Sequence, residues 1–161
     1  MDVEIGELLI RKVGQADIPV MTEHRLAYLA ELQGSRTDDY IATLREELIS
    51  FFRRAIAGEW MVALVAESNG QAIAYGAMVI RQIPGDLNKP FYLEADVLNM
   101  YTLPEFRRQG VSTLILQRLI EEARDAGISK LALHTSEAGE KMYRNSGFSD
   151  PLYPVLEKIL D

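Results

Sequence analysis

The strongest chemical signal in this sequence of 161 residues is a loop suited to binding phosphate. It reads Leu-Pro-Glu-Phe-Arg-Arg-Gln-Gly-Val-Ser at 103–112, between a predicted strand and a well-patterned helix. The first amides of a helix lack intrahelical acceptors and carry the positive end of the helix dipole, so they attract anions. Gly110 has no Cβ to keep a ligand from the backbone, and Arg107 and Arg108 add positive charge. The alternative interpretation is an ordinary helix start with two solvated arginines.

The loop matches neither common nucleotide-binding pattern. No Gly-Lys-Ser/Thr follows it, as a Walker loop requires, and it lacks the spaced glycines of a Rossmann turn. A nucleotide-binding α/β protein that used this loop for ATP would also need a metal-binding acid after a strand. We therefore set that interpretation aside.

Two segments at matching spacing resemble the GNAT superfamily of acyl-CoA N-acyltransferases. The first is Asn-Met-Tyr-Thr-Leu-Pro-Glu-Phe-Arg-Arg-Gln-Gly-Val-Ser at 99–112, and the second is Glu-Lys-Met-Tyr-Arg-Asn-Ser-Gly-Phe at 140–148. In that family the loop reads Arg/Gln-x-x-Gly-x-Gly/Ala, and a later helix carries Leu/Met-Tyr-x-x-x-Gly-Phe. The resemblance extends over essentially the whole chain. It implies a single N-acetyltransferase (GNAT) domain over residues 1–161, with acetyl-CoA as co-substrate.

The resemblance also implies which residues bind the cofactor. The backbone of 100–102 would pair with the pantetheine arm as an added strand, and the loop would hold the pyrophosphate. Ser112 stands where the family usually has Gly or Ala, and its hydroxyl could donate to a phosphate. Ser136 replaces a frequent Asn that contacts pantetheine. The predicted set is Met100, Tyr101, Thr102, Arg107, Arg108, Gln109, Gly110, Val111, Ser112 and Ser136.

Tyr143 occupies the place of the family's general-acid tyrosine. A phenol with a reference pKa of about 10 stays protonated at neutral pH and can protonate a thiolate whose conjugate acid has a pKa of about 8.5. The chain has no cysteine, only His24 and His134, and no Gly-x-Ser-x-Gly elbow, so a covalent acyl-enzyme is hard to build. Direct attack by the amine in a ternary complex, without a metal, is the simpler mechanism. The alternative is that Tyr143 only packs its ring.

Asp96 is the candidate base, on the strand that leads into the loop. Histone-type members of the family have a glutamate at the corresponding place, and the shorter aspartate favours a water relay. Glu94 shares the strand face and is the alternate. Either side chain could instead be a solvated carboxylate. The acceptor is not readable from the sequence, and a primary amine on a small molecule is favoured over a protein amine.

In the first half of the chain, hydrophobic spacing predicts one strand followed by two helices. The strand covers 8–13, and the first helix starts at 16–19, with Asp17 as its cap, and ends near Leu32. The second helix starts after Thr37-Asp38 and ends at Gly58. Arg25 and Tyr28 lie on the first helix, where such folds line the acceptor site, but they read equally as plain surface.

The second half alternates strands with helices. Strands are expected at 61–67 and 71–81 (joined by Ser68-Asn69-Gly70), at 91–102 and at 128–135, and a last extended segment runs from Gly147 towards 156–159. Helices are expected at 111–125 and 137–145. His134 ends its strand near the cleft and reads as structural. The element order gives an α+β fold, a GNAT-like three-layer α/β/α arrangement with a mixed, mostly antiparallel, splayed central sheet.

Composition limits the functional classes. With 48% hydrophobic and 25% charged residues, the chain has the make-up of one globular domain. A net charge of −7 disfavours nucleic acid and suits cationic or small neutral substrates. No apolar stretch approaches the roughly 20 residues of a membrane span, and neither a signal peptide nor a membrane partner is expected. The absence of cysteine fits a cytoplasmic protein. Tyr153-Pro154 near the C-terminus suits either a contact in a homodimer or packing in the core.

A second functional hypothesis is a non-catalytic acyl-CoA-binding or interaction module on the same fold. The tyrosine at 143 favours an enzyme, whereas the unsettled identity of the base keeps the module open. Release of coenzyme A with a panel of amines separates the two hypotheses.

Overall fold

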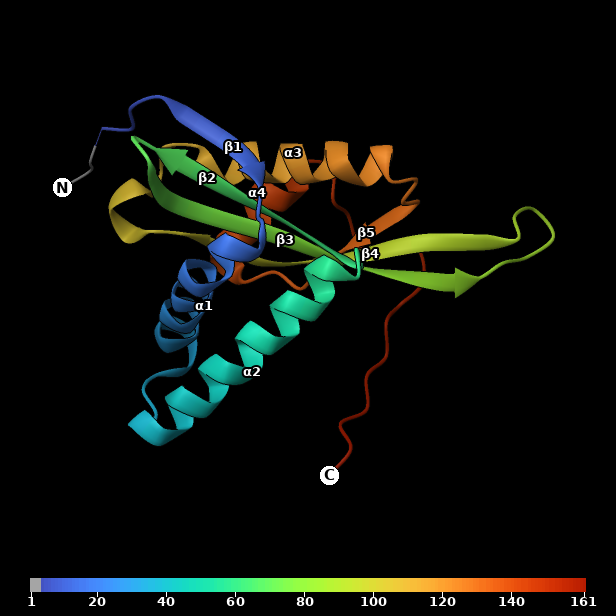
Figure 1. Ribbon diagram of the computed structural model, residues 1–161. Helices are drawn as coiled ribbons and strands as arrows, with labels where there is room; N and C mark the ends of the chain where they lie inside the picture. Colours follow the sequence, from blue (N-terminus) through green and yellow to red (C-terminus); the bar gives the residue numbers. More distant parts are fainter. Residues whose placement is uncertain (1–3) are drawn as a thin grey trace.

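The computed structural model describes residues 4–161, which form a five-stranded sheet (Figure 1). The strands follow chain order, and every neighbouring pair is antiparallel except the parallel pair β4–β5. The strands are β1 (Leu8–Lys12), β2 (Met61–Ser68), β3 (Gln71–Pro84), β4 (Phe91–Thr102) and β5 (Lys130–Ala132). The helices are α1 (Ile18–Gln33), α2 (Asp38–Ala57), α3 (Val111–Asp125) and α4 (Glu137–Asn145), with short 3-10 turns at Gln15–Asp17 and Pro104–Phe106.

Helices cover both faces of the sheet (Figure 1). On one face, α1 and α2 pack through a buried cluster that includes Ile18 and Phe52. On the other face, α3 packs through Ile115 and Leu119, and the partly buried Tyr143 of α4 joins the same cluster. The predicted three-layer α/β/α arrangement with a mixed sheet is confirmed.

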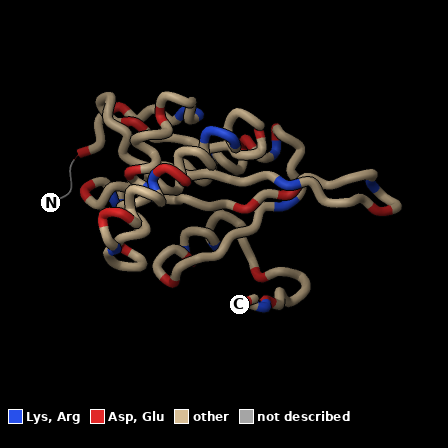
Figure 2. The backbone as a smooth tube through the Cα atoms, turned by 60° about the horizontal axis from the view of Figure 1, so that its bottom comes forward, with Lys and Arg blue, Asp and Glu red and all other residues tan. Residues whose placement is uncertain are grey.

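Most predicted elements begin and end where the sequence places them. β4, α3 and α4 have the predicted bounds, and α2 starts as expected, with Thr37 Oγ1 accepting the Tyr40 amide at 3.3 Å. Acidic residues are spread along the chain (Figure 2), in keeping with the net charge of −7. Within residues 4–161, no helix combines the length and the apolar character needed to cross a membrane.

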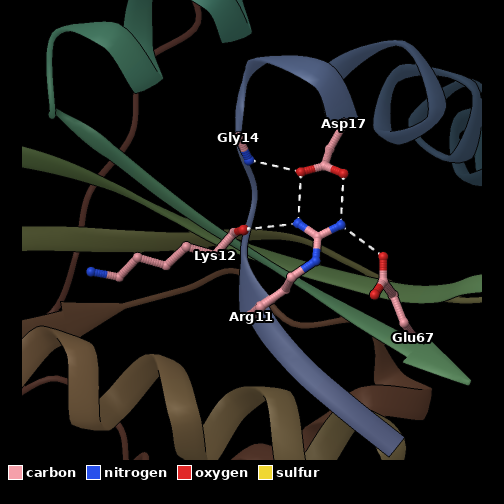
Figure 3. A network of polar contacts seen from close by, with 5 residues as sticks. All are labelled: Arg11, Lys12, Gly14, Asp17 and Glu67. Carbon is pink, nitrogen blue, oxygen red and sulfur yellow. Dashed lines mark hydrogen bonds and ion pairs between the residues drawn. The ribbon is translucent and has the colours of Figure 1, made fainter. Parts of the chain in front are cut away.

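Arg11 anchors the start of α1 to β1 and β2 (Figure 3). Its guanidinium donates to both carboxylate oxygens of Asp17 at 2.8 Å and to Glu67 Oε1 at 2.7 Å. The Gly14 amide also donates to Asp17, at 2.8 Å. Asp17 occupies the N-cap position of α1 as predicted, but its side chain makes no cap hydrogen bond, because its oxygens are taken by these donors and accept no amide of α1. The hydrogen bonds from Arg11 lower the pKa of Asp17.

Gly76 allows α3 to lie close against β3. A Cβ at this position would come within 2.5 Å of both Ile115 Cγ2 and Met100 Sδ. Gly76 also lies where the β3–β4 register shifts, between Tyr75 and Ala77. Close packing, rather than an unusual backbone angle, therefore requires a glycine here.

The sheet opens between β4 and β5. The parallel ladder joins only 94–96 to 130–132, and β4 then continues to Thr102 paired with β3 alone. Asn99 has a φ of 57°, opposite the register shift in β3. On the β5 side, the backbone of 97–102 therefore faces no strand in the described part of the chain.

Two predicted elements differ from the structure. β5 has three residues instead of spanning 128–135, because the Ile128 amide closes the end of α3 by donating to Ala123 O at 2.9 Å. The last segment joins no strand, and 149–161 have no helix or strand structure. Pro151 and Pro154 lack amide hydrogens, so they cannot donate to a ladder there.

Candidate active site

The loop between β4 and α3 is shaped by two residues with left-handed backbones. Arg108 has a φ of 62° and Gly110 a φ of 82°, and the buried Phe106 fixes the loop to the core. Gly110 directly precedes α3, whose first amides, like those of any helix, have no intrahelical acceptor. Apart from its two chain neighbours, no described residue has an atom within 4 Å of the position that a Cβ of Gly110 would take. The geometry is a cradle of amides open to an anion.

The Arg107 side chain is bound within the protein rather than directed into this cradle. Its Nε donates to Thr102 O at 2.8 Å, and its Nη2 donates to Glu31 Oε1 and Oε2 at 2.9 and 3.0 Å. The Tyr101 hydroxyl donates to the same Glu31 Oε1 at 2.9 Å, and the guanidinium lies over the Tyr101 ring. The hydrogen bond from Arg107 lowers the pKa of Glu31. Arg107 therefore ties the loop to α1.

The two serines that depart from the family pattern have structural partners. Ser112 Oγ and Thr102 Oγ1 lie 2.8 Å apart and join the start of α3 to the end of β4. Ser136 caps α4, with its Oγ accepting the Gly139 amide at 3.2 Å. Val111 is buried, whereas Arg108, Gln109 and Gly110 are exposed on the loop.

A groove of about 1010 Å³ runs between α3 and α4. Three basic side chains line it: Arg108 from the loop, Arg124 from α3 and Lys141 from α4. Sequence reasoning missed Arg124 and Lys141, because each reads alone as an ordinary solvated helix residue. Only the packing of the two helices brings them to one groove with Arg108.

Tyr143 lies partly buried on α4, at the sheet side of this helix. Its ring meets Phe148 edge to face at 5.9 Å, and Gly139 leaves it room, since a Cβ there would lie 3.2 Å from Tyr143 Cε2. Within residues 4–161 the structure gives its hydroxyl no hydrogen-bond partner. Burial raises the pKa of Tyr143, and the nearby Tyr28 raises it further. The phenol therefore stays protonated at neutral pH.

One face of α1 lies against β4 beside this tyrosine. Tyr28 packs on Tyr101 with ring centroids 5.8 Å apart, and Arg25 Nη1 donates to Asn99 Oδ1 at 3.5 Å. His24 meets Tyr101 at 6.1 Å, and burial lowers its pKa. The helical spacing of 24, 28 and 31 was the available signal, but the sequence did not show which face of the helix meets the sheet.

Asp96 and Glu94 share one face of β4, as predicted, and both pair with Arg81 of β3. Arg81 Nη1 donates to Asp96 Oδ2 at 2.8 Å, and its Nη2 to Glu94 Oε2 at 3.2 Å. Lys130 lies 3.2 Å from Glu94. Burial acts to raise the pKa of Glu94, but the hydrogen bonds from Lys130 and Arg81 outweigh it and lower the value. Asp96 lies on the last rung of the β4–β5 ladder, where the sheet begins to open.

Pairwise contacts thus join the loop and the open stretch of β4 to one face of α1, and Tyr28 of that face acts on Tyr143 of α4. His134 lies beyond the end of β5, with its side chain 94% exposed and 3.4 Å from Glu157. The described residues contain no group of three His, Cys, Asp or Glu side chains arranged to hold a metal ion.

Comparisons with known proteins agree with this architecture. The model of the acetyltransferase (GNAT) family matches residues 23–148. The chain is similar to a protein of Clostridium acetobutylicum described as a predicted acetyltransferase and crystallised with acetyl-CoA, at 28% identity and a TM-score of 0.80, over 94% of this chain and 96% of that one. A search of the curated proteins finds no match.

Two more distant structures share the fold. A GCN5-related N-acetyltransferase from Ralstonia eutropha is 21% identical, with a TM-score of 0.77 over 94% of this chain and 99% of that one. Glucosamine-6-phosphate N-acetyltransferase from Arabidopsis thaliana is 19% identical, with a TM-score of 0.65 over 96% and 99%.

The matched region begins within α1, ends at Phe148 and contains both motifs as well as the opening between β4 and β5. The chain belongs to the acetyltransferase (GNAT) family, and it is an acyltransferase.

Proposed function

We propose that this protein transfers an acetyl group from acetyl-CoA to a primary amine on a small molecule, by direct attack in a ternary complex. The observation that carries the proposal is the Tyr143 hydroxyl. It has no partner in the described residues, burial and Tyr28 raise its pKa, and Tyr28 in turn packs on Tyr101 in the open stretch of β4. A proton donor at this position suits a departing thiolate.

The cofactor would lie along the opening and then across the loop. The backbone of Met100–Thr102 pairs with β3 on one side and faces no described strand on the β5 side, where it suits the amide-bearing pantetheine arm as an added strand. The amides of 107–112 suit the pyrophosphate. Arg108, Arg124 and Lys141 line the groove between α3 and α4 and offer positive charge there for the third phosphate group of coenzyme A, which lies outside the pyrophosphate. Ser136, at the start of α4, would contact the arm between these sites.

The chemistry needs no covalent intermediate. The neutral amine adds to the thioester carbonyl, and the C–N bond forms as the carbonyl π electrons move to oxygen. The nitrogen of this intermediate carries a positive charge and releases one proton to solvent. The oxyanion then collapses, the C–S bond breaks, and the thiolate takes its proton from the Tyr143 hydroxyl. Solvent returns that proton to Tyr143. The products are an N-acetyl amide and coenzyme A.

Asp96 would accept, through a water molecule, the proton that the ammonium form of the acceptor must lose before the neutral amine attacks. Its pairing with Arg81 fixes the carboxylate at the edge of the opening, and the side chain remains 45% exposed, so water reaches it. Glu94 is the alternate, but it is held by both Arg81 and Lys130. This double pairing makes Asp96 the better candidate.

Thiol release with acetyl-CoA and a panel of primary amines tests the proposal, with mass spectrometry of the products. The expected result is amine-dependent release of coenzyme A together with the acetylated amine. Binding of acetyl-CoA without release in the presence of any amine would instead identify a non-catalytic acyl-CoA-binding module.

A further inference from the structure

Arg25 is a partly buried arginine without a carboxylate partner in the described residues. Its one side-chain hydrogen bond there is the long contact of 3.5 Å to Asn99 Oδ1, and burial lowers its pKa. Other arginines of the chain are matched by acids at 2.5–3.3 Å, among them Arg11, Arg45, Arg81, Arg107, Arg118 and Arg144. A guanidinium withdrawn from water without a counter-ion is costly, so the missing anion is the feature that needs explaining.

The position of Arg25 ties this feature to the active site. Asn99 is 5% exposed and lies where β4 bends, and Tyr28, one turn along α1, lies close to Tyr143. The nearby carboxylate of Glu31 is already bound to Arg107 and Tyr101. Arg25 therefore presents an unmatched positive charge on the side of the opening opposite α4.

We infer that Arg25 binds an anionic group, a carboxylate or a phosphate, carried by the amine acceptor. This inference rests on the proposed function. It reverses the expectation from the net charge of −7, because the field inside a cleft depends on the groups that line it rather than on the total. A planar guanidinium suits both anions, since it can donate two parallel hydrogen bonds.

Matched pairs of amines test the inference: propylamine against β-alanine, and ethanolamine against phosphoethanolamine. The wild type should show kcat/KM roughly 10–100-fold higher for the anionic member of at least one pair, the usual range for a hydrogen-bonded charge. The pair that shows the preference distinguishes carboxylate from phosphate. In Arg25→Met the preference should fall below about threefold, with the neutral amines little changed. Arg53→Met, at an exposed arginine of α2, is the matched control.

The outcomes separate the two proposals. Equal kcat/KM within both pairs, or a preference that survives Arg25→Met, overturns the role of Arg25 and leaves acetyl transfer intact. Failure of every amine to release coenzyme A overturns the proposed function itself.

Discussion

Substitution of Gly110 by valine should change affinity for coenzyme A far more than it changes the stability of the fold. Its φ of 82° is unfavourable for a side-chain-bearing residue, yet no described residue other than its two chain neighbours has an atom within 4 Å of the Cβ position. Gly110→Val should therefore cost folding only the left-handed strain, about 1–2 kcal/mol. The added methyl groups would project into the open cradle. Affinity for coenzyme A should fall much further than stability, because the phosphate competes for that space.

Gly127 is a control matched in conformation. It has a φ of 75° and equally open surroundings, but it follows the opposite end of α3. Gly127→Val should lose the same stability, about 2–8 °C in Tm for a chain of this size, and keep its affinity.

Thermal unfolding with and without coenzyme A measures both effects. Ligand at a hundred times its Kd stabilises the wild type by about 2.7 kcal/mol, or about 5–11 °C, and a 100-fold weaker site retains about 0.4 kcal/mol. We expect the large shift in the wild type and in Gly127→Val, and a shift of about 1–2 °C in Gly110→Val. Equal shifts in both variants would refute the cradle.

Three further predictions concern the base, acid sensitivity and packing. Asp96→Asn should lower turnover most near neutral pH and least at alkaline pH, where the amine deprotonates unaided; an unmoved pH–rate profile would transfer the role to Glu94. Asp17 has a lowered pKa, so its stabilising pairing with Arg11 is present above its unfolded pKa, about 3.9, and is lost as the pH falls through the native value. Asp17→Asn should lower Tm at pH 7 and flatten the acid limb of the Tm–pH curve, whereas parallel curves would contradict this. Gly76→Ala should destabilise by about 1–3 kcal/mol through crowding against α3, measured by urea unfolding, and an unchanged midpoint would show that the helix shifts freely.

The sequence predicted the elements that have their own local signals. Val111–Asp125 has a helical period and is bounded by glycines, so its limits were readable. The length of β5 was not readable in this way. The Ile128 amide is taken by the end of α3, and the β4–β5 ladder stops at Asp96, shortly before Asn99 and the register shift between β3 and β4. The prediction of a last strand failed for a related reason. The apolar pattern of 149–161 predicts an extended segment, but within residues 4–161 this segment pairs with no strand.

The residues of the candidate site differ in the same way, between those with a local sequence signal and those brought together only by packing. The anion cradle follows from one continuous segment, so Gly110 and its neighbours could be named directly from the sequence. The pairing of Arg107 with Glu31 joins residues far apart in the chain, and no local signal reports it. Arg25 and Tyr28 were set aside for the same reason, since only the packing of α1 on β4 shows which of its faces meets the opening.

The central claim is that the Tyr143 hydroxyl protonates the departing thiolate, and steady-state kinetics of Tyr143→Phe test it most directly. The hydroxyl has no hydrogen-bond partner in the described residues, so its removal should leave Tm and affinity for coenzyme A nearly unchanged. Turnover of acetyl-CoA with a good amine acceptor should fall roughly 10²–10⁴-fold, the range for loss of a positioned acid. Full turnover in a variant that folds and binds coenzyme A normally would contradict the account and leave solvent as the proton source.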